Sequence, residues 1–146
     1  MRSYEASAIS AAGPEDVWAR WIDVPRWSDV DGMESARLIG PFDVGSVLKT
    51  KARGFPESTL TITVVERPRL WTDESRTPGL RMTFEHLIEP MASGTKVTER
   101  VLLSGPLAWI AGPLLRRKMQ RLIVAATASI AQTAGESAVQ RPAADS

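Results

Sequence analysis

The sequence predicts an α+β fold, in which one antiparallel sheet packs against one long helix at its C-terminal end. Six segments between residues 34 and 104 alternate polar and apolar side chains and are separated by turn-forming glycines and prolines. Residues 104–135 instead have the apolar spacing of a helix, interrupted only at Gly112 and Pro113. One helix with an apolar stripe is therefore available to cover one sheet with a buried side.

The composition limits the kind of protein this can be. The chain has 146 residues, which is enough for a single domain with its own core. It has no cysteine, so disulfides and thiolate nucleophiles are excluded and a cytoplasmic location is expected. Its 18 basic and 17 acidic residues give a formal charge of +1, which argues against nucleic-acid binding. Without a signal peptide or a run of about 18 apolar residues, we expect no export and no stable membrane insertion.

The N-terminal third begins with a strand and continues with two short helices. Residues 3–10 alternate in polarity and predict the strand. A helix is expected from Pro14, because proline suits a first helical turn and the two acidic residues after it oppose the helix dipole. A second, one-turn helix is expected over residues 24–28, with Asp23 as its N-cap. The first helix has an apolar face that we interpret mainly as core, formed by Val17, Trp18, Trp21 and Ile22.

Six further strands follow from the alternation of side chains. In "STLTITVVE", residues Leu60, Ile62 and Val64 lie on one face and the threonines on the other, so one side of the sheet is buried and the other solvated. An antiparallel sheet is implied. The predicted strands span residues 34–39, 45–52, 58–66, 69–75, 80–90 and 94–104.

The C-terminal helix is expected to begin near Pro113. Its apolar stripe has helical spacing and basic residues around it. Residues 136–146 have few bulky apolar side chains and are expected to be a disordered tail after a domain of residues 1–135. The stripe consists of Leu115, Met119, Leu122, Ala126, Ile130 and Thr133.

The order of these elements resembles a known superfamily. The relevant segments are "PEDVWARWIDVPRW", "GPFDVGSVLKT", "VVERPRLWT", "FEHLIEP" with "GTKVTERV", and "SGPLAW". In this order they resemble the START-like polyketide cyclase/dehydrase and lipid-transport superfamily, often called SRPBCC. The resemblance implies a helix-grip fold, in which a curved seven-stranded antiparallel sheet wraps around the long C-terminal helix. It also implies a cavity for a hydrophobic small molecule between sheet and helix, in a fold that hosts carriers, cyclases, hydrolases and regulators.

The single histidine, His86, is the main candidate for chemistry. It shares the apolar face of its strand with Met82 and Phe84, so it is expected to point inward. If a short loop joins the last two strands, positions whose numbers sum to 185 are paired, and His86 lies opposite Glu99. Such a pair anchors a polar group of a ligand or acts as a general base with its orienting carboxylate. The alternatives are a structural pair, or a register slip that separates the two residues.

Aromatic and apolar residues complete the candidate site. Trp71 is expected to form a flat wall of the cavity for a ring-bearing ligand, and Trp27 is placed near the entrance or in the core. His86 and Glu99 are the candidate catalytic residues. The full candidate ligand-binding set is Trp27, Trp71, Met82, Phe84, His86, Glu99, Val101, Met119 and Leu122.

Other motifs indicate neither a metal nor a cofactor. "DVDGME" has too few ligand positions for a calcium loop, and one histidine without cysteine makes zinc implausible. No nucleophile elbow and no phosphate-binding glycine loop occurs, so we expect no cofactor. Whether Lys49, Lys51 or Arg53 points inward is left open, with a solvated face favoured.

The segment over residues 105–121 sets apolar side chains, among them Leu107, Trp109 and Ile110, beside basic ones. One interpretation is a lid over the cavity that makes transient contact with an anionic membrane during ligand exchange. The other is a helix start that packs on the sheet and has a solvated basic face.

Three functions therefore stand side by side. The leading hypothesis is a protein that binds an apolar, ring-containing small molecule. The second is an enzyme of the cyclase or dehydrase kind, in which His86 and Glu99 move a proton. The third is a regulatory or protein-partner module with a vestigial cavity. An open pocket above about 300 Å³ that includes His86 favours the first two, whereas a filled core favours the third. The sequence gives neither the ligand nor the oligomeric state.

Overall fold

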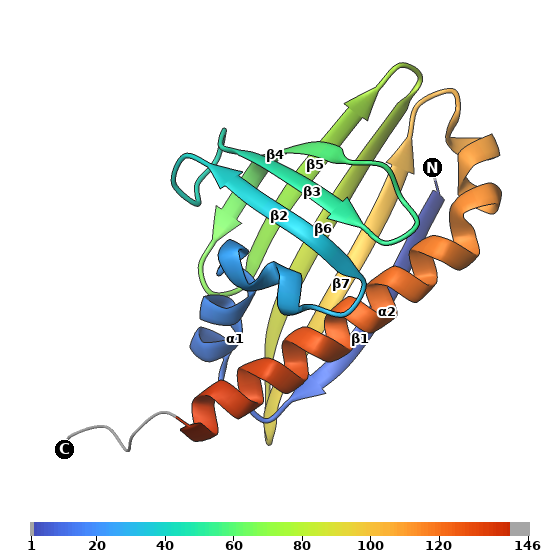
Figure 1. The fold of residues 1–146 in the computed structure, drawn as a ribbon. Coiled ribbons are helices and arrows are strands. Elements are labelled where there is room, and N and C mark those ends of the chain that lie inside the picture. Colours follow the sequence, from blue (N-terminus) through green and yellow to red (C-terminus); the bar gives the residue numbers. More distant parts are fainter. Residues whose placement is uncertain (1, 141–146) are drawn as a thin grey trace.

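The protein forms one curved antiparallel sheet with a long helix lying across it (Figure 1). The structure is a computed structural model that describes residues 2–140, the last four by their backbone alone. The strand order is β1-β7-β6-β5-β4-β3-β2. The strands are β1 (Arg2–Ser10), β2 (Met33–Ile39), β3 (Val47–Ala52), β4 (Ser58–Glu66), β5 (Leu70–Thr77), β6 (Leu80–Met91) and β7 (Gly94–Ser104). The helices are α1 (Pro14–Trp21), the 3-10 helix η1 (Val24–Asp29) and α2 (Ala108–Gln140).

This architecture confirms the predicted α+β helix-grip fold. The short helices α1 and η1 follow β1 and lie at one end of the sheet, while α2 runs diagonally along its open side (Figure 1). All neighbouring strands are antiparallel. The β6–β7 hairpin has the expected register, with Ile88 opposite Val97, His86 opposite Glu99 and Phe84 opposite Val101. The tight turn before Gly94 sets this pairing.

A β-bulge in β4 corrects one facing assignment. Ile62 pairs with Asp73, but the next paired residue of β4 is Val64, which lies opposite Thr72. Thr63 is therefore the extra residue, and the side-chain alternation shifts by one position after it. As a result Val65 packs against the core, and the prediction that Val64 shares the buried face with Ile62 is wrong.

The hydrophobic core divides into two clusters along the sheet. One lies under α1 and η1 and contains the tryptophans 18, 21, 27 and 71 together with Ile88 and Ile130. The other lies between β1, β7 and the first half of α2, around Tyr4, Leu103 and Ile123. Each cluster joins strand side chains to one half of α2, so the helix is held along its length by apolar contacts.

The long helix starts and ends outside its predicted limits. It begins at Ala108, and Pro113 lies inside it, so the expected start near Pro113 is wrong. Pro113 is the sixth residue of α2, so the helix lacks one backbone hydrogen bond there, the one to the carbonyl of Trp109. The hydroxyl of Tyr4 donates a hydrogen bond to the carbonyl of Gly112 beside this proline, which ties the helix to β1. At the other end, residues 136–140 continue α2 rather than forming the expected tail, and residues 141–146 lie outside the described part of the chain.

The helix η1 forms where it was expected but without the predicted cap. Asp23 occupies the N-cap position, yet its side chain makes no capping hydrogen bond. Its backbone carbonyl instead accepts from the N–H of Arg26 at 3.0 Å, which closes a tight 3-10 turn. Pro25 fits within this first turn, where its missing N–H costs nothing.

Substitutions at Met119 and Val124 test which face of α2 packs on the sheet. Its side chain is 2% exposed, whereas Val124 on the same helix is 50% exposed. We expect Met119→Asp to lower the free energy of unfolding by about 2 to 5 kcal/mol, through lost burial and an unpaired charge. Val124→Asp, the matched control, is expected to change it by less than about 1 kcal/mol. Urea unfolding of both variants measures this, and equal effects would contradict the orientation of α2.

Candidate functional site

A pocket of about 580 Å³ lies between the inward face of the sheet and α2. Its roof consists of apolar side chains of α2, including Leu115, Met119 and Ala126. Its floor comes from β5, β6 and β7, and Trp21 and Trp27 line it from α1 and η1. The pocket borders both core clusters, because Met119 and Ile123 of one cluster and Ile130 of the other also line it.

The β3–β4 loop contributes to the pocket lining. Several exposed residues line the pocket there, among them Pro56 and Glu57. Lys118 of α2 reaches across to this loop: its Nζ lies 4.9 Å from the ring centre of Phe55 and donates a hydrogen bond to the carbonyl of Gly54. A cation over an aromatic face together with a hydrogen bond holds the loop against the helix.

His86 stands on the pocket floor with both ring nitrogens hydrogen-bonded. Nδ1 lies 3.1 Å from the carbonyl oxygen of Trp71, and Nε2 lies 3.1 Å from Oε1 of Glu99. A backbone carbonyl only accepts, so Nδ1 carries a hydrogen. The second contact then needs another proton between Nε2 and the Glu99 carboxylate. Burial by itself lowers the pKa of His86, but the hydrogen bond and charge of Glu99 outweigh it and raise the pKa, so the imidazolium form is favoured.

The imidazole of His86 packs within an aromatic cluster. It stacks on the indole of Trp71 with ring centres 3.6 Å apart and an interplanar angle of 6°, and the edge of Trp21 approaches it at 5.1 Å. Trp27 covers Trp71 from another side at 5.7 Å, and its Nε1 donates to the carbonyl of Trp21 at 2.7 Å. A positive charge on the imidazole is further stabilised by the π face of the indole.

Asp73 is a second ionisable group on the floor. It lies on β5 opposite Phe84 of β6, two positions from Trp71, which is the partner of His86. Asp73 is 3% exposed, and its Oδ1 has no hydrogen-bond partner among the described residues. Burial raises the pKa of Asp73 to about 7, which the charge of His86 opposes and that of Glu99 reinforces. Asp73, His86 and Glu99 thus form a polar row across three adjacent strands.

Most of the residues predicted for the site lie together. The pocket is lined by Trp27, Met82, Phe84, His86, Glu99, Met119 and Leu122. Two others do not line it: Trp71 is fully buried and covered by His86, and Val101 is fully buried in the second core cluster. The expected flat wall at Trp71 is therefore replaced by Trp21 and Trp27, which cover the same end of the pocket.

Sequence reasoning missed Asp73 and the pocket role of Trp21. For Asp73 a signal was present, because it stands two residues after Trp71 and side chains two apart share a strand face. The same alternation brings Ser75 and Thr77 of β5 into the pocket lining. Trp21 was assigned to the core by its helical spacing, and it is indeed buried, but part of its ring also meets the pocket.

The basic residues of β3 point away from the pocket. Leu48 is fully buried and Thr50 lines the pocket, so the alternation turns Lys49 and Lys51 outward, and Lys51 pairs with Glu34 at 2.7 Å. Arg53 is exposed. The favoured solvated face is thereby confirmed. Within residues 2–140 no three acidic or histidine side chains are grouped to hold a metal ion.

Residues 105–114 do not cover the pocket. The pocket lining on this side begins at Leu115, while Leu107 packs beside Gly79 at the β5–β6 turn. The proposed lid is therefore not found at this position. The other interpretation, a helix start that packs on the sheet, agrees with Ala108, which is 3% exposed within the second core cluster, while Trp109 is 68% exposed. Transient contact of this apolar segment with an anionic membrane stays a prediction. Among the described helices, none is long and apolar enough to span a membrane.

A curved antiparallel sheet closed by a C-terminal helix over a pocket defines the helix-grip class of proteins. Over residues 1–135 the sequence matches the family described as "Polyketide cyclase / dehydrase and lipid transport". The chain belongs to this family, as its resemblance to the superfamily predicts. No curated protein matches the sequence.

Solved structures share the fold at low sequence identity. The protein TTHA0849 from Thermus thermophilus is 14% identical, with a TM-score of 0.74 over 93% of this chain and 98% of that one. Norcoclaurine synthase from Thalictrum flavum, in complex with dopamine and hydroxybenzaldehyde, is 16% identical, with a TM-score of 0.70 over 97% and 88%. The di-domain ARO/CYC StfQ from the steffimycin biosynthetic pathway is 11% identical, with a TM-score of 0.73 over 94% and 52%. At such identities the likeness concerns the fold alone.

The raised pKa of Asp73 makes stability depend on pH. Its carboxyl ionises near pH 4 in an unfolded chain but near pH 7 when folded, so the folded state binds more protons between these values and loses stability as pH rises through them. Asp73→Asn removes this titration. Relative to the wild type, the variant is expected to gain about 2 to 4 kcal/mol between pH 4 and pH 8. Urea unfolding across this range measures the difference, and a difference independent of pH would contradict the assignment.

Proposed function

We propose that the protein binds an apolar, ring-containing small molecule in the pocket between the sheet and α2. The observation that carries the proposal is the pocket of about 580 Å³, whose apolar roof faces a floor with a short polar row. Drug-sized molecules occupy pockets of about 300 to 1,000 Å³ with mainly apolar walls and a few polar groups. Trp21, Trp27 and Phe84 offer aromatic surface for a ring. The third hypothesis, a regulatory or protein-partner module with a vestigial cavity, predicts a filled core. A pocket of about 580 Å³ argues against that hypothesis.

Blocking the pocket tests this function. Ala126 lines the pocket, whereas Ala128 on the same helix is exposed. Binding is measured by the fluorescence of N-phenyl-1-naphthylamine, a neutral ring compound that brightens in apolar surroundings. We expect Ala126→Trp to weaken binding at least about tenfold, because the indole occupies the ligand's volume, and the matched Ala128→Trp to leave it within about twofold. Circular dichroism and melting confirm folding. Failure of the wild type to bind, or equal binding by both variants, would overturn the proposal.

An acid–base enzyme is the second candidate, and the polar row favours it. Asp73, with its pKa of about 7, is able to take up or release a proton near neutral pH. Two solved structures of the same fold are norcoclaurine synthase, whose name is that of an enzyme, and the ARO/CYC protein StfQ of a biosynthetic pathway. His86 is less suited to accept a substrate proton, since Trp71 and Glu99 occupy both of its nitrogens. This occupancy is why we rank binding above catalysis.

His86→Phe separates the two candidates. Phenylalanine keeps a ring on Trp71 but removes both hydrogen bonds, and it leaves Glu99 without its partner. We expect the free energy of unfolding to fall by about 3 kcal/mol, while the affinity for N-phenyl-1-naphthylamine changes less than about threefold. If the wild type dehydrates a β-hydroxy thioester and the variant does so about a hundredfold more slowly, at unchanged probe affinity, the enzyme is favoured over the binding protein.

A further inference from the structure

The pocket floor holds one carboxyl group, that of Asp73, for which the described residues supply no neutralising partner. His86 and Glu99 are paired with each other across 3.1 Å. Asp73 beside them is 3% exposed and lines the pocket. Its Oδ1 accepts no hydrogen bond from the described part of the chain. A buried carboxylate oxygen without a donor is costly, so a site that retains one is suited to a ligand that brings the donor.

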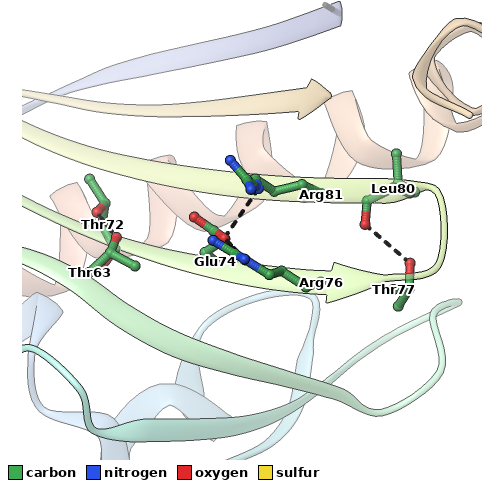
Figure 2. A network of polar contacts seen from close by, with 7 residues as sticks. All are labelled: Thr63, Thr72, Glu74, Arg76, Thr77, Leu80 and Arg81. Carbon is green, nitrogen blue, oxygen red and sulfur yellow. Dashed lines mark hydrogen bonds and ion pairs between the residues drawn. The ribbon is translucent and has the colours of Figure 1, made fainter. Parts of the chain in front are cut away.

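The nearby cations are directed away from Asp73. Alternation along β5 turns Asp73 inward and its neighbour Glu74 to the opposite face. Figure 2 shows Glu74 between Arg76 and Arg81; Arg76 forms an ion pair with it, and the Nε of Arg81 lies 3.4 Å from its Oε1. The guanidinium groups closest along the β5–β6 hairpin are therefore already paired with Glu74 on that face.

Among the described residues, the strand and helix packed on the other sides of Asp73 place apolar side chains near it. On β4 its partner is Ile62, and the α2 side chains that line the pocket are apolar. The ionisable groups facing it from neighbouring strands are His86 of β6 and Glu99 of β7. Two more charged residues line the pocket, the exposed Glu57 and Arg76, and the guanidinium of Arg76 is paired with Glu74.

We propose that the pocket selects ring-containing molecules that carry a protonated amine, and that the ammonium group donates to the carboxylate of Asp73. The inference rests on the proposed binding function and specifies its ligand class. An ammonium supplies both the missing hydrogen bond and the missing positive charge, a hydroxyl supplies only the first, and a carboxylate is repelled. Phe84 lies directly opposite Asp73, and Trp21 and Trp27 line the same pocket, so aromatic faces surround the cation.

The selectivity is expected to depend on pH through Asp73. Above about pH 7 its carboxyl is ionised and attracts the ammonium, and below that value it is increasingly neutral. The preference for an amine over a neutral analogue therefore rises with pH as long as the amine itself stays protonated. His86 titrates in the same pocket, so the Asp73→Asn variant is needed to assign the effect.

Two probes of the same shape test the proposal, 2-(2-naphthyl)ethylamine and 2-(2-naphthyl)ethanol. Their dissociation constants are measured by isothermal titration calorimetry at pH 8 and pH 5.5. We expect the wild type to bind the amine at least about tenfold more tightly than the alcohol at pH 8 and within about threefold at pH 5.5. Asp73→Asn is expected to remove the preference at pH 8 while leaving the affinity for the alcohol unchanged within about threefold.

Glu74→Gln is the matched control, because it removes one negative charge from the adjacent residue on the opposite face. It is expected to retain the amine preference. If the alcohol binds but the amine binds no better at pH 8, the inference is overturned and the proposed function stands. If neither probe binds, the proposed function fails with it. Should Asp73→Asn not fold, a wild-type preference that is the same at both pH values still overturns the inference.

Discussion

The hydrogen bond between His86 Nε2 and Glu99 Oε1 joins β6 to β7 on the floor of the pocket. It exists only in one register of the hairpin, because a shift by one residue would turn the two side chains to opposite faces. The carbonyl of Trp71 fixes the other ring nitrogen, and the indole of the same residue fixes the plane of the ring. Three strands thus contribute to one orientation of one imidazole.

The aromatic cluster separates the core from the pocket. Trp71 is fully buried, and it lies between His86 and Trp27 with Phe42 at its edge 5.0 Å away. Its size fills the end of the curved sheet beneath α1 and η1, so space remains only farther along α2. The tryptophans near the N-terminus therefore fill the core, and two of them, Trp21 and Trp27, also line the pocket.

Local patterns predicted the strands and the β6–β7 register, because strand alternation and a short turn act between residues close in sequence. Features that depend on distant contacts were not predictable in the same way. The bulge at Thr63 reverses the facing of Val64, and the contact of Tyr4 with Gly112 supports helix before Pro113. Asp73 was overlooked because an aspartate in a strand suggests a solvated face, and only the placement of Trp71 indicates otherwise.

The inward positions of β5 have a consequence for how such proteins diversify. Asp73, Ser75 and Thr77 enter the pocket from a strand whose neighbours are β4 and β6. Hydrogen-bonded strands hold their side chains more rigidly than loops do, and the fold tolerates sequence change at single sites. Substitutions at these three positions would change the polar groups of the pocket while the sheet and α2 keep their arrangement. Solved structures with 11% to 16% identity to this chain share its architecture although most of their residues differ.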